Sequence, residues 1–200
     1  MKLIQSLLLI AAIAISLPDR AKAAEYAIDS DHTNIVFKVG HLGISSVTGR
    51  FERFSGSLHF DANNVENTRA SATIDVASIN TGVEKRDDHL RSADFFEVEK
   101  FPHIKFASTG IKNVRDSKFQ IVGDLTIRGV TQSIALDAEL GGVVKDPWGN
   151  QRVAIAATAT INRKDFGLGW NQVLETGGLL VGEKIDIELE VEGVLQQDKK

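Results

Sequence analysis

Apolar and polar residues alternate with a period of two along most of the chain. The clearest example lies near the C-terminus, where aliphatic residues at 185, 187, 189 and 191 alternate with acidic residues at 186, 188, 190 and 192. Successive side chains of a β-strand point to opposite faces, so this pattern predicts a strand with one buried and one solvated face. The pattern recurs over 26–28, 35–39, 54–60, 70–76, 104–108, 119–127, 134–140 and 153–161. We therefore expect about eight or nine strands.

The expected strands follow one another through short connections. The runs 119–127 and 134–140 are joined through Arg128-Gly129-Val130-Thr131, a glycine-containing turn typical of a β-hairpin. Free strand edges favour aggregation, and closing the sheet into a barrel removes them. A two-sheet sandwich is the alternative. Long strands and short connections favour an all-β fold, namely an eight-stranded antiparallel up-and-down barrel.

One segment departs from the alternation. Thr81 and Glu84 have the spacing of a capping box, in which the two side chains satisfy free backbone amides at the start of a helix. Acidic residues come early in the following segment and Arg91 comes late, the order that a helix dipole favours. We expect one short helix near residues 82–93, lying across one end of the barrel. The side chains expected to pack inward are Val83, Leu90, Phe95 and Phe96.

Residues 162–184 form a second irregular segment. It contains five glycines together with Phe166, Trp170 and four leucines. A solvated loop is seldom both glycine-rich and apolar. We expect this segment to pack as a flap on an apolar surface and to act as a gate. A permanently packed loop is the alternative, since glycine also serves simple turns.

The first 23 residues predict a cleaved signal peptide. Lys2 precedes an uninterrupted apolar run over 7–15, and Ala21-Lys22-Ala23 offers the small residues that signal peptidase recognises. The run is too short to cross about 30 Å of hydrocarbon, so a membrane anchor is the weaker interpretation. We expect export to the periplasm with removal of residues 1–23, and residues 24–200 to form a single barrel domain without a membrane span.

Composition narrows the possible functions. Removing three basic residues and one acidic residue with the signal peptide changes the formal net charge from −4 to −6, the wrong sign for binding nucleic acid. The lack of cysteine excludes disulfides, thiol catalysis and iron–sulfur clusters. The sequence shows neither a dinucleotide-binding loop nor a nucleophile elbow. We expect no cofactor, no metal and no catalytic residue. The histidines, which lack metal-site spacing, are His32, His41, His59, His89 and His103.

The barrel interior can hold a guest or be filled by its own side chains. Ten phenylalanines and two tryptophans lie mostly on apolar strand faces or in the 162–184 segment, and a small barrel can be filled by such residues. Gly56 and Gly123 fall on core-facing positions, where a missing side chain leaves room for a guest. The residue pattern supports the two interpretations about equally.

Five segments share motifs with one known family. They are Arg86–Phe96, Phe101–Phe106, Gly123–Thr131, Asp146–Gly149 and Lys164–Gly167. In this order, and over about residues 24–195, the chain resembles the YceI family of bacterial lipid- and polyisoprenoid-binding proteins. The resemblance implies a lipocalin-like barrel with an amphiphile threaded through its centre, a periplasmic location and a homodimer. It implies no catalytic residue.

The resemblance also implies a ligand class, namely a polyisoprenoid, an isoprenoid quinone or a fatty-acid-like lipid, bound for transport, storage or stress protection. Each buried methylene contributes ~0.8 kcal/mol, so a long chain can bind with few polar contacts. We expect His41 and Arg91 to contact the head group at the opening. The residues expected to contact the chain are Phe37, Val39, Phe54, Leu58, Ile74, Phe106, Leu125 and Trp170. The alternatives are a periplasmic enzyme acting on a lipid or isoprenoid head group, and a filled barrel whose outer surface contacts partners.

Overall fold

The computed structural model describes residues 23–175 and 177–196, and within them the chain is almost entirely β-structure. The predicted signal peptide lies outside the described residues apart from its last position. The strands are β1 (Ala24–Ile28), β2 (Asn34–His41), β3 (Ser45–Phe51), β4 (Phe54–Phe60), β5 (Arg69–Asp75), β6 (Ile79–Asn80), β7 (His103–Arg115), β8 (Lys118–Ile127), β9 (Val130–Lys145), β10 (Gln151–Asn162) and β11 (Val181–Leu195).

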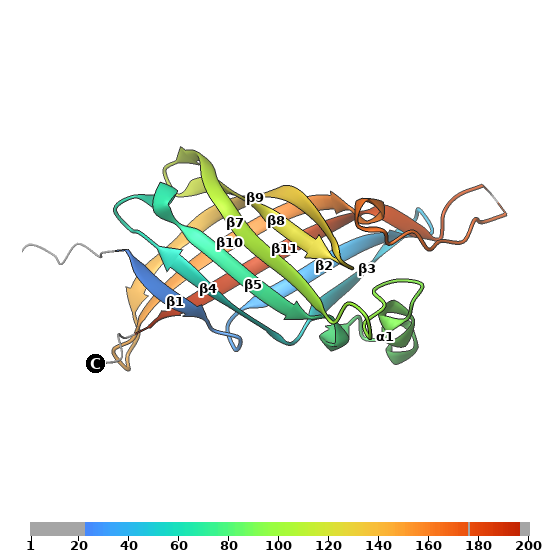
Figure 1. Cartoon of the computed structure of the whole chain (residues 1–200), viewed down its shortest axis with the longest axis horizontal. Coiled ribbons are helices and arrows are strands. Elements are labelled where there is room, and N and C mark those ends of the chain that lie inside the picture. Colours follow the sequence, from blue (N-terminus) through green and yellow to red (C-terminus); the bar gives the residue numbers. More distant parts are fainter. Residues whose placement is uncertain (1–22, 176, 197–200) are drawn as a thin grey trace, which may run out of the picture.

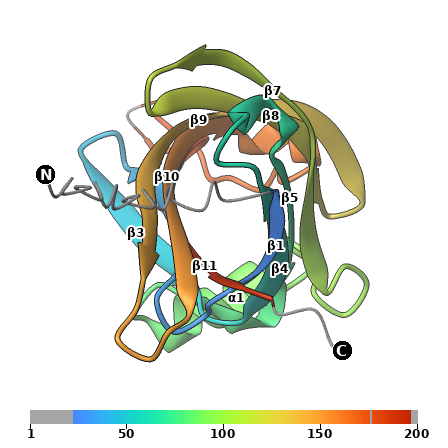
Figure 2. The ribbon, with the colours of Figure 1, turned by 90° about the vertical axis from the view of Figure 1, so that its left-hand side faces the viewer.

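The strands close into an eight-stranded antiparallel barrel, as the alternation predicted (Figures 1 and 2). β11 closes the ring, because its C-terminal part pairs with β1 and the rest of it pairs with β2. β1 and β2 are therefore two parts of one barrel position. β3 with β4, and β5 with β6, are divided in the same way by short interruptions. Every neighbouring pair is antiparallel, and apart from the closing pair each barrel position lies beside the next one along the chain, which is the up-and-down order.

The alternation missed β3 and underestimated several long strands. On the inner face of β3, Val47 and Phe51 are apolar but Gly49 stands between them, so the sequence pattern is broken. Phe37 is paired with Gly49 across β2 and β3, and a Cβ on this glycine would lie 2.3 Å from the ring carbon Cζ of Phe37. The phenylalanine ring thus covers the glycine, a contact between strands that the local pattern cannot reveal.

The predicted helix is present as α1 (Glu84–Arg91), with a different N-terminus from the one expected. Val83 is the N-cap residue and makes no side-chain capping bond. Thr81 instead donates its backbone N–H and its hydroxyl to the buried carboxylate of Asp87, at 2.9 and 2.5 Å. The capping-box prediction was wrong because Thr81 lies two positions before the N-cap residue. Val83 is also exposed instead of packing inward.

Two packed clusters divide the interior along the barrel. At the end that carries β1, the interior is filled by ten buried residues, which are Tyr26, Leu58, Phe60, Phe119, Ile121, Leu136, Ala138, Val153, Ile155 and Ala157. At the opposite end, which α1 covers in Figure 1, the buried residues are Phe51, Val76, Ile79, Phe95, Ile104, Leu125, Ile127, Phe166 and Leu168. Within the described residues, no helix has the length and hydropathy required to cross a bilayer.

Candidate functional site: an apolar cavity with a polar mouth

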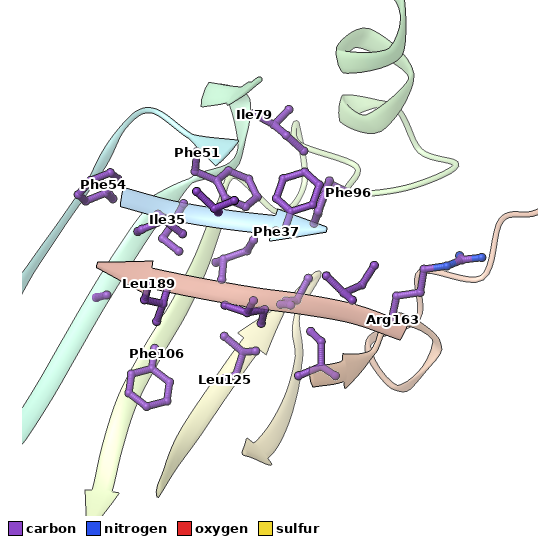
Figure 3. A pocket seen from close by; sticks show the side chains of 18 of the residues that line it. Ile35, Phe37, Phe51, Phe54, Ile79, Phe96, Phe106, Leu125, Arg163 and Leu189 are labelled. Atoms are coloured by element: carbon purple, nitrogen blue, oxygen red, sulfur yellow. The ribbon is translucent and has the colours of Figure 1, made fainter. Parts of the chain in front are cut away.

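A cavity of about 200 Å³ lies inside the barrel, mainly in the half toward α1 (Figure 3). Its described lining is aliphatic and aromatic except for Thr33 and Arg163. The barrel strands supply most of these residues, with the largest shares from β2 and β11, since alternate side chains of each strand point inward. An apolar lining offers burial but little hydrogen bonding, so the cavity suits a hydrocarbon group.

The cavity is long and narrow. On β11 its lining runs from Val181 to Val191, a stretch of about 30 Å at ~3.3 Å per residue. A volume of about 200 Å³ distributed over that length leaves a thin channel. Phe37, Phe51 and Phe96 lie together on its helix side in Figure 3, with ring centroids of neighbouring pairs 5.7 and 6.2 Å apart. This shape fits a flexible linear chain better than a compact ring system.

A second cavity, of about 180 Å³, forms the mouth of the channel. It shares Phe37, Val39 and three other lining residues with the channel, so the two spaces adjoin. Unlike the channel, the mouth carries several polar side chains, and these are His41, Thr81, Arg86, His89 and the indole of Trp170. The walls are therefore mainly hydrocarbon throughout, and the opening adds a few hydrogen-bonding side chains.

Trp170 and α1 meet over the mouth. The ring centroid of His89 lies 4.7 Å from that of Trp170 and 5.1 Å from that of Phe95, in both cases edge to face. His89 Nε2 is hydrogen-bonded to the carboxylate of Asp94 at 2.8 Å. Aromatic contacts of this kind contribute about 0.5–1.5 kcal/mol beyond area burial. The 162–184 segment is thus attached to the helix by a small aromatic cluster of Trp170, His89 and Phe95.

Arg86 and Asp87 share one partner at the mouth. Arg86 Nε donates to the Thr81 hydroxyl at 2.7 Å and Nη2 donates to the Thr81 carbonyl at 2.8 Å, while the same hydroxyl donates to Asp87. Arg86 makes no ion pair with a described carboxylate. Its remaining N–H groups can therefore serve a ligand oxygen.

Arg163 is a buried guanidinium that fastens the base of the 162–184 segment. It donates to the carbonyl oxygens of Leu168, Val181 and Gly182, the last at 2.8 Å. Burial lowers the pKa of Arg163 below its ordinary value. In Figure 3 its nitrogen atoms point away from the other labelled side chains, so the aliphatic stem lines the channel while the charged end holds backbone.

The segment 162–184 consists of a packed base and a projecting tip. Phe166 and Leu168 are buried in the barrel core, as expected of an apolar flap. Asn171 joins the base to β11, because its side chain both donates to and accepts from the backbone of Val181. Beyond it, Val173 and Leu179 pair across a short hairpin and are exposed.

The structure brings most of the sequence-predicted site residues together. Phe37, Val39, Phe54, Ile74, Phe106 and Leu125 line the channel, and His41 and Trp170 line the mouth. Leu58 instead lies in the packed cluster at the other end. Arg91 borders neither space, because its guanidinium donates to Asp88 and to the carbonyl oxygens of Ala77 and Ile79.

Sequence reasoning did not select Arg86, His89 or Leu90 as site residues: Leu90 was expected to pack inward, and the charged face of the helix was left to solvent. A signal for them was available. Residues three and four apart lie on one helix face, and Leu90 was already expected to face inward. Arg86 lies four residues before Leu90, and His89 lies three residues after Arg86, so the spacing places both near the face that carries Leu90. Ile35 was also available, since it shares the inner face of β2 with Phe37 and Val39, and the alternation over 185–191 had already marked Ile187 and Leu189 as inward-facing.

Gly56 and Gly123 do not leave room for a guest. A Cβ on Gly123 would lie 2.5 Å from the ring of Phe106, and one on Gly56 would lie 2.3 Å from the carbonyl oxygen of Ser71 and 2.5 Å from Cδ1 of Ile28. The space at each glycine is thus filled by a neighbouring side chain together with backbone of the adjacent strand. The glycines act indirectly, because Phe106 and Ile28 can lie flat against the wall instead of across the channel.

Gly49→Ala tests this role of glycine. The three nearest atoms to the new Cβ belong to the side chains of Phe37 and Thr81, at 2.3–2.8 Å, so the Phe37 ring must move and the channel should narrow. We expect the amount of bound hydrocarbon chain per protein to fall, measured by extraction and mass spectrometry. The double variant Gly49→Ala/Phe37→Leu should regain it. Full loading of the single variant would contradict this account.

A cluster of charged side chains lies beside the end of β1, away from the mouth. Asp29, His32 and Glu192 are close enough for a metal, the one such group among the described residues. Arg152 already occupies its centre, since Nη1 donates to Asp29 at 2.7 Å and also to Glu192, and Nε donates to Asp146 at 2.9 Å. A guanidinium among these carboxylates supplies the positive charge that a metal ion would bring. We interpret the cluster as a structural network.

Known proteins are similar to this chain in both sequence and fold. The family model for the YceI-like domain matches residues 26–193. A UPF0312 protein of Vibrio vulnificus is 38% identical over 185 residues, which are 92% of this chain and 94% of the relative. A UPF0312 protein of Staphylococcus aureus is 40% identical over 168 residues, covering 84% of this chain and 95% of the relative.

Three solved structures resemble the barrel. The Campylobacter jejuni YCEI protein is 33% identical, with a TM-score of 0.69 over 79% of this chain and 90% of that one. Burkholderia cenocepacia BcnA is 21% identical, with a TM-score of 0.73 over 82% and 98%. A polyisoprenoid binding domain from Saccharophagus degradans is 17% identical, with a TM-score of 0.63 over 88% and 100%. At identities below 25%, the last two show a shared fold alone.

Proposed function

The chain belongs to the YceI-like family, as its motifs predicted, and from this premise we propose that it binds a long apolar amphiphile inside the barrel without transforming it. The single observation that carries the proposal is the thin apolar channel whose mouth adds a few polar side chains. A structural neighbour of the same fold is a polyisoprenoid binding domain. A polyisoprenoid, an isoprenoid quinone or a fatty-acid-like lipid matches the channel.

The hydrocarbon chain supplies most of the affinity. One five-carbon isoprenoid unit contributes ~3 kcal/mol on burial, before the costs of ordering. The chain lies against Phe37, Val39, Phe54, Ile74, Phe106 and Leu125, and the head group lies at the mouth. There His41, Arg86 and His89 orient it through hydrogen bonds, and Arg86 is suited to a carbonyl, carboxylate or phosphate oxygen.

The location and the assembly belong to the same proposal. We propose that the protein is exported to the periplasm with cleavage after Ala23, where it carries, stores or shields its ligand. The homodimer that the resemblance implies remains a prediction. Export, role and dimerisation concern where and how the cavity is used, and they do not alter which ligand the cavity is expected to bind.

Native mass spectrometry of the exported protein tests the function and the export together. We expect a non-covalent lipid retained on a chain whose mass corresponds to residues 24–200. Denaturation should release the lipid chemically intact. An empty, rigid barrel would support the filled-barrel alternative, and turnover of an added lipid would support the enzyme alternative. A mass that includes residues 1–23 would contradict cleavage.

The flap carries its own reporter in Trp170. In a Trp148→Phe background, stripping the lipid should shift Trp170 emission to longer wavelength, because the indole leaves His89 and Phe95 for water. Amide exchange over 166–182 should accelerate while β11 stays protected from 185 to 191. Identical emission and exchange with and without lipid would mean that the flap is a permanently packed loop.

A further inference from the structure

Two neighbouring hairpin tips at the mouth expose large apolar side chains. The turn between β2 and β3 exposes Leu42 by 36% and Ile44 by 86%. The tip of the 162–184 segment exposes Val173 by 76% and Leu179 by 38%. We call these four residues the rim patch. They account for four of the nine large hydrophobic residues that are exposed in the described part of the chain.

The backbone shows that the two tips lie side by side. Leu42 N–H donates to the Leu180 carbonyl at 2.9 Å, and Leu180 N–H donates to the Gln172 carbonyl at 2.9 Å. Val173 pairs with Leu179 within the second tip. The three chain segments therefore form one small continuation of the barrel wall beyond the mouth, with the rim patch on it.

The turn between β2 and β3 has an unusual residue, a leucine, at a position with positive φ. Leu42 and Gly43 both have positive φ, 56° and 71°, as in the two central residues of a type I′ turn. Asn, Asp or Gly is the usual residue at the position of Leu42, because bulky side chains are strained there. The other described non-glycine residues with positive φ are polar, namely Glu97, Asn113, Asp116 and Arg128. An exposed leucine is thus held in a strained conformation at an exposed tip.

The rim patch is continuous with the mouth and nearly free of charge. His41 and Leu180 line the mouth cavity and are adjacent along the chain to Leu42 and Leu179, respectively. Residues 42–49 contain no charged side chain, and 166–182 contain only Glu175. Charged groups are costly to bring into a bilayer, and uncharged tips with aliphatic side chains avoid that cost. A hydrocarbon chain leaving a bilayer at this rim would reach the channel without crossing water.

We infer that the rim patch docks on the surface of a lipid bilayer and that the ligand chain passes between bilayer and channel there. The partner is a neutral, zwitterionic lipid surface, because Glu175 is the only charged residue within 42–49 and 166–182, and these stretches contain no lysine or arginine to attract anionic lipid. The inference rests on the proposed function, since the patch matters as the route into the barrel. It adds the place at which the ligand is exchanged.

The test separates docking from binding. Vesicles of phosphatidylcholine carry cis-parinaric acid, a fluorescent linear fatty acid, and its transfer to the exported protein is followed by emission. Ile44→Ser/Val173→Ser should slow the transfer and reduce co-flotation with the vesicles by about tenfold or more, through loss of exposed aliphatic surface. Trp148→Ser is the matched control. Trp148 is 81% exposed, but it lies in the turn between β9 and β10, so both quantities should stay unchanged.

Three further outcomes have defined meanings. Binding of cis-parinaric acid from aqueous solution should be equal in all variants, and its absence from the unaltered protein would overturn the proposed function itself. Normal binding in solution with no vesicle co-flotation, or with equal transfer in every variant, would overturn docking alone. If the double variant instead changes a dimer into a monomer by light scattering while transfer is unaffected, the rim patch joins two copies of the chain and the inference fails. Adding phosphatidylglycerol should not increase docking.

Discussion

Leu125→Trp should abolish most ligand binding while leaving the barrel folded. Leu125 lies on β8, is buried and lines the narrow channel, so an indole there occupies the space of the hydrocarbon chain. Excluding one isoprenoid unit removes ~3 kcal/mol, which corresponds to binding weaker by about a hundredfold. Lipid recovered per protein, measured by extraction and mass spectrometry, should fall accordingly.

Leu58→Trp is the matched control for this result. Leu58 has the same residue type and similar burial, but it lies in the cluster that fills the opposite end of the barrel. Overpacking there should cost about 1–3 kcal/mol of unfolding free energy and leave the ligand in place. Full lipid loading of a folded Leu125→Trp variant would show that the interior is not the binding site.

Arg152→Leu should give the largest loss of stability among single changes outside the channel. The guanidinium joins three carboxylates from different parts of the chain, which are Asp29 after β1, Asp146 in the turn between β9 and β10, and Glu192 on β11. Removing it leaves these poorly solvated acids facing one another. We expect the melting temperature at pH 7 to fall on the order of 5 °C or more. Arg50→Leu, which breaks the exposed pair with Glu52, should change it little.

The pH dependence of that loss provides a second measurement. Hydrogen bonds from Arg152 lower the pKa of both Asp29 and Asp146 to about 2, from the ordinary value of 3.8. A carboxyl with a lowered pKa in the folded state stabilises fully above its unfolded pKa and loses that contribution as pH falls through the folded value. The native protein should therefore lose stability between about pH 4 and pH 2, and the Arg152→Leu variant should lose less. A constant difference between the two proteins over that range would contradict the network.

The two ends of the barrel are filled differently, and this difference explains how the barrel can contain a channel and remain stable. The end that carries β1 is filled by side chains, and Arg152 joins its chain segments through ion pairs. Toward α1, phenylalanine rings lie over glycines, as Phe37 does over Gly49. The stability of the fold can thus come from one half of the barrel and the binding capacity from the other. Substitutions such as Leu58→Trp and Leu125→Trp, both on inward-facing positions, should separate the two properties.

The amino-acid sequence by itself determined the barrel. Period-two alternation identified most strands and their inner faces, the charged segment near 84–91 identified the helix, and the motifs identified the family. Alternation could not find β3, because Gly49 owes its place to Phe37 on another strand. The capping-box prediction failed for a similar reason. Thr81 donates its N–H and its hydroxyl to the Asp87 carboxylate, and its hydroxyl does not accept from a free amide at the start of the helix.

Only the tertiary structure decided where along the barrel the interior is hollow. The period of a strand tells which face a side chain takes but not how many side chains meet at that height, so Leu58 and Leu125 are equivalent in the sequence. Which residues fill a layer depends on the register of eight strands and on the tilt that closing them imposes. The same register brings Arg152 between Asp29 and Glu192, and it brings Trp170 onto His89, residues separated by long stretches of chain. Such contacts arise from closing the ring, and no local pattern records them.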